Sequence, residues 1–322
     1  MTAPSGHITG DVRPPSRRRV AVVINPRSGS GALDKDEIAR RVEESFSARG
    51  MTAFVELAHN GTDLIAACGR AATGSADTVV AAGGDGTIAA VAATLVNTNK
   101  LLGVLPLGTF NYFARAFGVP LELEDAIDVV AVGVPKPADI GEVNGRIFVN
   151  NSSLGLYPTV LHHREAAYRK LGRSRWASYL SVAFALAQPP ALMKVQLAVD
   201  GLPFPRRTPL LFVGMNADQM DSFSIPGTTC LDSHRLAVCV IRPLRMLELW
   251  RLGIRAFIRG LDGSSELEVV CAHELEVSMR PKRVRVALDG ETVILQTPLH
   301  YRLRAAALRV LVRGAHSDGR QQ

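Results

Sequence analysis

The chain contains no long hydrophobic run. None of its apolar segments approaches the ~20 residues that a membrane-spanning helix requires. The run Val20–Ile24, which follows a polar N-terminal stretch, is also too short for the core of a signal peptide. The sequence therefore predicts a cytoplasmic protein, and any contact with a membrane is expected to be peripheral, at its inner face.

Cysteine is scarce, with four residues in 322, and no two of them stand at CxxC spacing. This pattern excludes the usual zinc-binding motifs and gives no sign of a disulfide framework. We therefore expect free thiols in a reducing compartment.

Two common nucleotide-binding signatures are also missing. No GxxxxGK(S/T) string occurs, and the pair Gly29 and Gly31 lacks the third glycine of GxGxxG because position 34 is Asp34. The standard P-loop and the dinucleotide fingerprint are therefore excluded. Internal repeats and low-complexity segments are absent from the sequence as well.

The composition that remains is that of a globular protein with a basic surface. Apolar residues make up 47% and charged residues 21%, and the net charge is +7. The length allows two domains. A basic surface suits nucleotides, nucleic acids or acidic lipid headgroups, although a solvated basic surface without a partner fits equally well. No sequence signature of a nucleic-acid-binding fold is present, so we expect no nucleic-acid partner.

The pattern of the first half predicts an α/β fold. Strand and helix signals alternate after a disordered basic tail (1–19), which indicates a doubly wound, mostly parallel nucleotide-binding domain over 20–142. The expected strands are 20–24, 53–57, 78–82 and 101–105, and the expected helices lie around 38–46 and at 63–72, 88–96, 112–117 and 123–132.

The pattern changes near Pro135–Pro137, after which strands follow one another with few helices. We expect a β-rich, mostly antiparallel sandwich or barrel over 143–313 and a loose tail over 314–322. The last strand of this part is allowed to return to the first domain. Expected strands are 147–151, 195–199, 210–214, 236–241, 266–270, 275–278, 284–288 and 292–295, with basic, aromatic-bearing helices near 163–187 and 244–259.

Three glycine-bearing loops follow strands of the first domain: Asn25–Gly31, Gly83–Thr87 and Gly108–Asn111. Ligands of open α/β sheets bind at the carboxyl ends of the strands, so these loops are expected to face one crevice. Glycine lets a phosphate approach the backbone, and the N-terminus of the following helix supplies free N–H groups. Asp85 within the second loop indicates a metal ion or a transferred proton next to that phosphate.

Four ordered strings carry a resemblance to a known family. Asn25-Pro26-x-Ser28-Gly29, Gly83–Thr87, Leu107-Gly108-Thr109-x-Asn111 and Leu288–Glu291 resemble the signatures of the diacylglycerol kinase catalytic family, which includes bacterial lipid kinases and sphingosine kinases. The match runs in order from about residue 20 to 312, and this order makes it far more specific than a lone GGDGT string.

The resemblance implies an ATP- and Mg²⁺-dependent kinase that transfers the γ-phosphate of ATP to a hydroxyl of a diacylglycerol-like or sphingoid lipid at an anionic membrane surface. It implies that Asp85 organises Mg-ATP, that Asp289 and Glu291 are catalytic, and that Glu291 accepts the proton. It also implies that the β-rich domain over 143–313 binds the lipid and that the active site lies in the cleft between the two domains. A homodimer is left open. The implied nucleotide-binding residues are Asn25, Ser28, Gly29, Gly83, Gly84, Asp85, Gly86, Thr87, Gly108, Thr109 and Asn111.

One string departs from the family pattern. Where family members commonly carry Leu-Asp-Asp-Gly around a structural Mg²⁺, this chain has Leu231-Asp232-Ser233-His234. A hydroxyl is a weaker Mg²⁺ ligand than a carboxylate, so a structural metal at Asp232 is doubtful. Two alternatives stay open: a soluble kinase similar to NAD kinases, and a pseudokinase that binds nucleotide or lipid without turnover. Asp289-Gly290 by itself also fits an ordinary hairpin turn.

Overall fold

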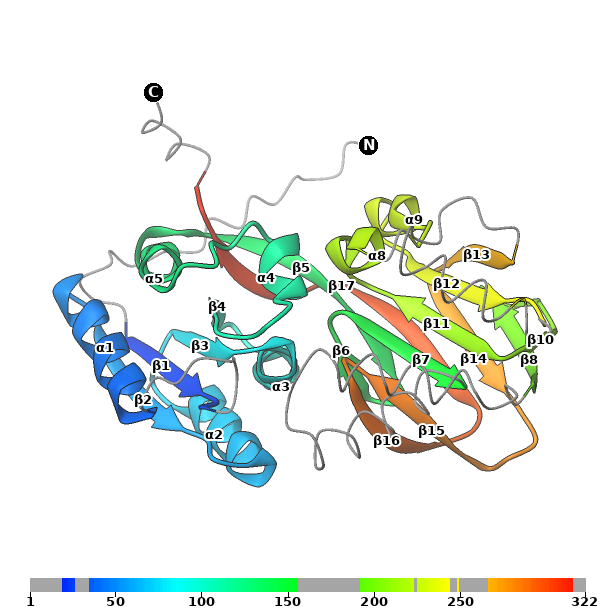
Figure 1. Ribbon diagram of the computed structural model, residues 1–322, viewed down its shortest axis with the longest axis horizontal. Coiled ribbons are helices and arrows are strands. Elements are labelled where there is room, and N and C mark those ends of the chain that lie inside the picture. The colour runs from blue at the N-terminus through cyan, green and yellow to red at the C-terminus, as the bar shows by residue number, and fades with distance from the viewer. Residues whose placement is uncertain are drawn as a thin grey trace, which may run out of the picture.

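The computed structural model describes residues 19–26, 35–155, 192–222, 225–243, 248 and 266–314. Its strands form an 11-stranded sheet and a 6-stranded sheet, with helices packed mainly on the first half (Figure 1). No helix in these ranges is long and apolar enough to cross a membrane. Apart from Glu248, the helices expected at 163–187 and 244–259 lie outside the described residues.

The first half of the chain builds the parallel part of the large sheet, in the order β4-β3-β1-β2. The two central strands are continuous apolar runs because both of their faces are covered. The elements are β1 (Arg19–Ile24), α1 (Lys35–Ala48), β2 (Thr52–Leu57), α2 (Gly61–Thr73), β3 (Thr78–Gly83), α3 (Asp85–Leu95), β4 (Leu101–Pro106), α4 (Tyr112–Ala116) and α5 (Leu123–Val132). All the strands and helices expected here are present, which confirms the α/β class.

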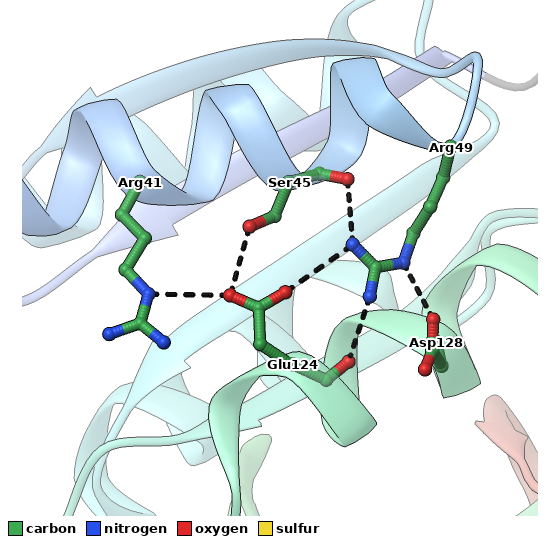
Figure 2. A network of polar contacts seen from close by, with 5 residues as sticks. All are labelled: Arg41, Ser45, Arg49, Glu124 and Asp128. Atoms are coloured by element: carbon green, nitrogen blue, oxygen red, sulfur yellow. Dashed lines mark hydrogen bonds and ion pairs between the residues drawn. The ribbon is translucent and has the colours of Figure 1, made fainter.

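A polar network fastens α1 to α5 on this half (Figure 2). The carboxylate of Glu124 accepts hydrogen bonds from Ser45 at 3.0 Å and Arg41 at 3.3 Å, and Arg49 contacts both Glu124 at 3.4 Å and Asp128 at 2.6 Å. Burial alone would raise the pKa of Glu124, but these hydrogen bonds and the two arginine charges lower it. Helices distant in sequence are therefore joined by charge as well as by the core.

The second half builds the antiparallel sheet, in the order β13-β12-β11-β7-β15-β16, and also extends the large sheet. Sandwich packing of the two sheets buries alternate side chains of their strands. The elements are β5 (Val134–Val143), β6 (Arg146–Phe148), β7 (Asn151–Gly155), β8 (Met193–Val199), β9 (Leu202–Pro203), β10 (Arg206–Thr208), β11 (Leu210–Gly214), α8 (Ala217–Ser222), α9 (Thr228–Asp232), β12 (Leu236–Ile241), β13 (Leu267–Ala272), β14 (Glu274–Ser278), β15 (Arg283–Leu288), β16 (Glu291–Gln296) and β17 (Leu299–Val312).

The longest strand, β17, links the two halves. It pairs with β14 near its start, with β5 over most of its length, and with β4 through Val310 opposite Leu102. The sequence pattern does not predict β5 or β17. The two prolines of β5 disfavour a strand there. The many arginines and alanines of β17 obscure the alternation of apolar and polar residues that is typical of a strand. Both strands are stabilised by pairing with each other across the chain.

The strand expected at 147–151 is two strands, β6 and β7. The break falls where the backbone N–H groups of Val149 and Asn150 donate to the carboxylate of Asp289, at 2.9 and 2.7 Å. A side chain from the other end of the chain therefore replaces a strand partner at this point.

The expectation of free thiols is wrong for two of the four cysteines. Cys230 in α9 and Cys271 in β13 form a disulfide, with their Cα atoms 5.1 Å apart. The two cysteines are separated by 41 residues, so their spacing in the sequence does not predict the bond. The packing of α9 on the antiparallel sheet brings them together. Cys68 and Cys239 are free and buried.

Candidate active site

The Gly83–Thr87 loop lies where β3 ends and α3 begins. Gly84 is the N-cap of α3, and no side chain caps the helix, so the cap leaves room for an outside acceptor. A Cβ on Gly83 would lie 2.5 Å from the hydroxyl of Thr87, which itself accepts a hydrogen bond from Asn25 Nδ2 at 3.2 Å. The loops after β1 and β3 are therefore in contact, as predicted.

The third loop packs directly against the second. A Cβ on Gly108 would lie 2.5 Å from Gly84 Cα, so only glycine fits there without a backbone shift. Asn111 holds this loop closed: its Oδ1 accepts from Gly108 N and its Nδ2 donates to Gly108 O, both at 3.0 Å. Asn111 is buried and has a positive φ of 54°. Thr109 at the loop tip is exposed.

Asp85 lies in the first turn of α3 and faces the start of α4. Its Oδ1 accepts a hydrogen bond from the backbone N–H of Phe113 at 3.0 Å. The carboxylate therefore links the loop after β3 to the start of α4. It is only partly buried. It lies at a helix N-terminus, where a negative charge is stabilised and where phosphate or a metal ion can be bound.

The Asp289-Gly290 turn is a two-residue hairpin between β15 and β16, and both residues have positive φ, 47° and 87°. The hairpin interpretation and the functional one are thus compatible. The Asp289 carboxylate accepts from the N–H groups of Val149, Asn150 and Asn151 at 2.7 to 3.0 Å. Burial raises its pKa to about 6, the three N–H donors oppose that rise, and the charge of Asp85 adds to it.

Glu291, at the start of β16, lies close to the N-terminal part of α3 in the first half of the chain. It is exposed, and its Oε1 lies 3.8 Å from the position that a Cβ on Gly86 would occupy. Asp85 and Asp289 are also close enough for their charges to interact. Carboxylates from both halves therefore meet at the N-terminus of α3, the arrangement that the four strings predict.

A cluster of buried amides next to Asp289 was not predicted from the sequence. Asn216 Nδ2 donates to Asn150 Oδ1, and Asn151 Nδ2 donates to Gln219 Oε1, both at 2.7 Å. Asn151 Oδ1 is buried and has no hydrogen-bond partner in the described part of the chain. The signal available was the pair Asn150-Asn151 directly after the apolar run Ile147–Val149, because an amide pair inside a buried strand requires partners.

Three of the predicted site residues lie elsewhere or cannot be placed. Ser28 and Gly29 are outside the described residues. Asp232 is exposed at the end of α9, and no group of three or more potential metal ligands occurs within the described ranges. Next to it, His234 Nδ1 contacts Asp139 Oδ2 at 2.5 Å. An imidazole therefore occupies the place where the family string has glycine.

Comparisons with known proteins identify this architecture. Residues 19–143 match the model of the diacylglycerol kinase catalytic domain. A diacylglycerol kinase of Bacillus subtilis is 28% identical over 279 residues, which cover 85% of this chain and 90% of that protein. A protein of Pseudomonas savastanoi named a probable YegS-like lipid kinase is 29% identical over 304 residues, covering 87% and 96%.

A solved structure supports the fold. The crystal structure of a diacylglycerol kinase from Bacillus anthracis matches with a TM-score of 0.70 at 21% identity, over 92% of this chain and 98% of that one. The fold and the sequence matches define the protein as a kinase built from an α/β half and a β-rich half. More narrowly, residues 19–143 carry a match to the diacylglycerol kinase catalytic domain, and the resemblance of this chain to that family is confirmed.

Proposed function

We propose that the protein transfers the γ-phosphate of ATP, with Mg²⁺, to a hydroxyl of a diacylglycerol-like or sphingoid lipid. The observation that carries the proposal is the approach of Glu291 to Gly86 at the N-terminus of α3, next to Asp85. This arrangement brings a possible proton acceptor and a glycine-rich phosphate cradle together from opposite ends of the chain.

The residues present fit a nucleotide phosphate. Gly84 and Gly108 approach so closely that any side chain at Gly108 would fill the space between the loops. A phosphate can therefore reach the uncapped N–H groups of α3, and the helix dipole favours its charge. Gly86 has open space except toward Glu291. Asn25, Thr87 and Thr109 add polar groups along the same edge.

The carboxylates also fit a divalent cation. Mg²⁺ is bound in kinases by one or two carboxylates together with phosphate oxygens and water, and Asp85 is the carboxylate that we propose for this role. The cation would neutralise charge on the transferred phosphoryl group. Asp85 also keeps Phe113 and the loop before it in place through its hydrogen bond, so it has a second, positioning role.

Glu291 is the proposed proton acceptor. The acceptor hydroxyl loses its proton to the Glu291 carboxylate, its oxygen forms the new bond to the γ-phosphorus, and the bond from that phosphorus to the bridging oxygen of ADP breaks. Asp289 is a positioning residue, because its oxygens are already occupied by three backbone N–H donors. By holding the hairpin against Val149–Asn151, it sets the place of Glu291.

We further propose that the protein acts peripherally, on lipid in an anionic membrane surface. The net charge of +7 supports this because a basic protein concentrates at anionic bilayers. A homodimer remains a hypothesis that a sedimentation experiment can test.

The test is a kinase assay with radiolabelled ATP, Mg²⁺ and a total lipid extract in mixed micelles, with the labelled product identified by mass. We expect a labelled lipid with the wild type, a loss of at least roughly 100-fold with Glu291→Gln, and normal turnover with Glu43→Gln, an exposed glutamate of α1. Labelling of NAD without lipid, or nucleotide binding without any turnover, would overturn the proposal in favour of the two alternatives.

A further inference from the structure

The cluster of buried amides lies between the Asp289 hairpin and α8. Its members are Asn150, Asn151, Asn216 and Gln219, and each of them is at most 7% exposed. Two side-chain hydrogen bonds join residues that are 66 and 68 positions apart in the sequence. Buried amides need such partners, so the cluster forms only when α8 packs beside the break between β6 and β7.

The backbone at this break does not depend on the side-chain amides. The N–H groups of Asn150 and Asn151 donate to the carboxylate of Asp289 at 2.7 and 3.0 Å. The carbonyl oxygen of Asn150 accepts from the N–H of Met215 at 2.8 Å, and that of Asn151 accepts from the N–H of Asp289 at 2.9 Å. The amides therefore add a second set of contacts to a backbone that is already hydrogen-bonded.

Stability alone does not account for the cluster either. Each buried amide exchanges hydrogen bonds with water for hydrogen bonds within the protein, so its net contribution to folding is small. Asn151 Oδ1 is buried and finds no partner among the described residues, which is a cost. Apolar side chains of similar size would avoid this cost. What the amides supply instead is direction, because a hydrogen bond weakens steeply when its angle bends.

The four amides form a continuous chain of contacts that ends on α8. Gln219 Oε1 accepts from Asn151 Nδ2, and Asn216 Nδ2 donates to Asn150 Oδ1, both at 2.7 Å. Asn216 Oδ1 also accepts from the backbone N–H of Gln219 at 2.9 Å and so caps the first turn of α8. The position of α8 therefore fixes the orientation of both asparagines.

α8 in turn packs against α4, a helix of the α/β half (Figure 1). In α4, the backbone N–H of Phe113 donates to Asp85 at 3.0 Å. The two short helices therefore connect Asp85, which is bonded to α4, with the backbone that holds Asp289, which is bonded to α8. A shift of α8 would move the Asp289 hairpin, and Glu291 with it, relative to Asp85.

We propose that Gln219 and Asn216 are positioning residues for phosphoryl transfer, which act through the two asparagines and the Asp289 hairpin on the place of Glu291. The inference rests on the proposed function, because it takes Glu291 as the proton acceptor. A general base must lie within hydrogen-bond reach of the proton that it removes, so a displacement of ~1 Å lowers the rate strongly. The amides therefore contribute to the rate without touching the reacting atoms.

The experiment uses two variants of the full chain and one matched control. Gln219→Met removes one amide and keeps most of the side-chain volume. Asn216→Ser keeps a hydroxyl that can cap α8 but is too short to reach Asn150. The control is Thr208→Val in β10, which also replaces a buried polar group by an apolar one and deletes the 2.6 Å hydrogen bond to the carbonyl of Leu210.

Thermal melts first set an assay temperature at which every variant is folded. The kcat and the KM for ATP are then measured in the lipid kinase assay, for each change alone and combined with Glu291→Gln. Hydrogen exchange of the peptide over 148–154, followed by mass spectrometry, reports on the backbone at the break independently of activity.

We expect Gln219→Met and Asn216→Ser each to lower kcat by roughly 10-fold or more, with the KM for ATP changed by less than about two-fold. Neither change should slow the Glu291→Gln variant further, because residues that act through one group are not additive. Exchange over 148–154 should become faster in both variants. Thr208→Val should alter neither kcat nor this exchange.

The same fold-loss with and without Glu291→Gln would indicate a merely structural role and overturn the inference. Unchanged kcat or unchanged exchange in Gln219→Met and Asn216→Ser would overturn it as well. Normal turnover by Glu291→Gln alone is a different failure: it would overturn the proposed role of Glu291, and this inference with it.

Discussion

The carboxylate of Asp85 accepts a hydrogen bond from the backbone N–H of Phe113 at 3.0 Å and so joins the loop after β3 to the helix after β4. The same residue lies at the N-terminus of α3, where Glu291 arrives from the far end of the chain. One side chain thus supplies both a structural contact and the negative charge proposed for the metal ion.

These two roles can be separated by Asp85→Asn, which keeps an oxygen acceptor for Phe113 but removes the charge. We expect a melting temperature close to that of the wild type and a fall in phosphoryl transfer of roughly 100-fold or more. Asp125→Asn, which removes an exposed charge from α5, is the control and should leave turnover unchanged. Equal turnover in the Asp85 and Asp125 variants would contradict the proposed role.

The contact between Gly108 and Gly84 predicts that Gly108→Ala is damaging. The new Cβ would lie 2.5 Å from a backbone atom, which cannot rotate away, so one loop must move. We expect a loss of ~1–3 kcal/mol in the free energy of unfolding and weaker binding of a fluorescent ATP analogue.

Gly69→Ala is the matched control for this change. Gly69 lies inside α2, and no atom lies within 4 Å of the position that a Cβ would occupy there, so alanine should stabilise the protein by ~0.5–1 kcal/mol. Similar melting temperatures and analogue affinities for the two alanine variants would show that the two loops do not form a tight cradle.

The network in Figure 2 predicts a pH-dependent contribution to stability. The pKa of Glu124 is lowered in the folded protein, so its stabilising effect is present above the unfolded pKa of about 4.3 and is lost as pH falls through the folded pKa. Because the Glu124 side chain is 43% exposed, solvent screening limits the effect of Glu124→Gln to about 1 kcal/mol at pH 7.

This difference between Glu124→Gln and wild type should disappear in urea unfolding curves recorded near pH 3. Asp125→Asn, one residue further along α5 and outside the network, should show a smaller effect. A constant difference at both pH values would mean that packing, and not charge, is responsible.

His234 and Asp139 predict the opposite pH trend. The hydrogen bond to Asp139 and its charge raise the pKa of His234, so this stabilising contact is fully present below the unfolded pKa of about 6.5. It is lost as pH rises through the higher folded pKa. His234→Asn keeps a residue that tolerates the positive φ of 54° at this position and removes the imidazolium charge.

Thermal melts between pH 6 and 9 should show the wild type losing its advantage over His234→Asn as pH increases. The exposed His59, changed to Asn, is the control and should leave the pH profile of stability unaltered. A wild-type advantage that grows with pH would contradict the assigned contact.

The four cysteines fall into two groups: Cys230 and Cys271 form a disulfide, and Cys68 and Cys239 are buried free thiols. Burial raises the pKa of Cys239 to about 12 and that of Cys68 to about 11, so neither thiol should react with iodoacetamide in the native protein. Intact mass after unfolding without reductant should show two alkylations. Reduction should cost about 4 kcal/mol of stability, given the 41-residue separation. Four alkylations without reductant would refute the bond.

Much of the α/β half could be predicted from sequence because its signals are local. Val20–Ile24 and Thr78–Ala82 are apolar runs of strand length followed by glycine-rich turns, and each helix after them carries its own apolar period. The site loops could be predicted for the same reason, since their residues stand directly after buried strands.

The features that were not predicted depend on distant partners. Pro135 and Pro137 are tolerated in β5 because β17 pairs with this strand from the other end of the chain. The side-chain amides of Asn150 and Asn151 form hydrogen bonds with Asn216 and Gln219, which are distant in the sequence. The strand is interrupted at this point because the backbone N–H of Asn150 donates to Asp289.

The amino-acid sequence by itself determined the buried parallel strands, the glycine loops at their carboxyl ends and the Asp289-Gly290 turn, because turn preference and hydrophobic period act between near neighbours. Only the tertiary structure decided that Glu291 lies against Gly86, that Cys230 reaches Cys271, and that β17 pairs with β5. Those contacts arise when two sheets pack and one long strand pairs with both halves, and no local pattern encodes such a distance.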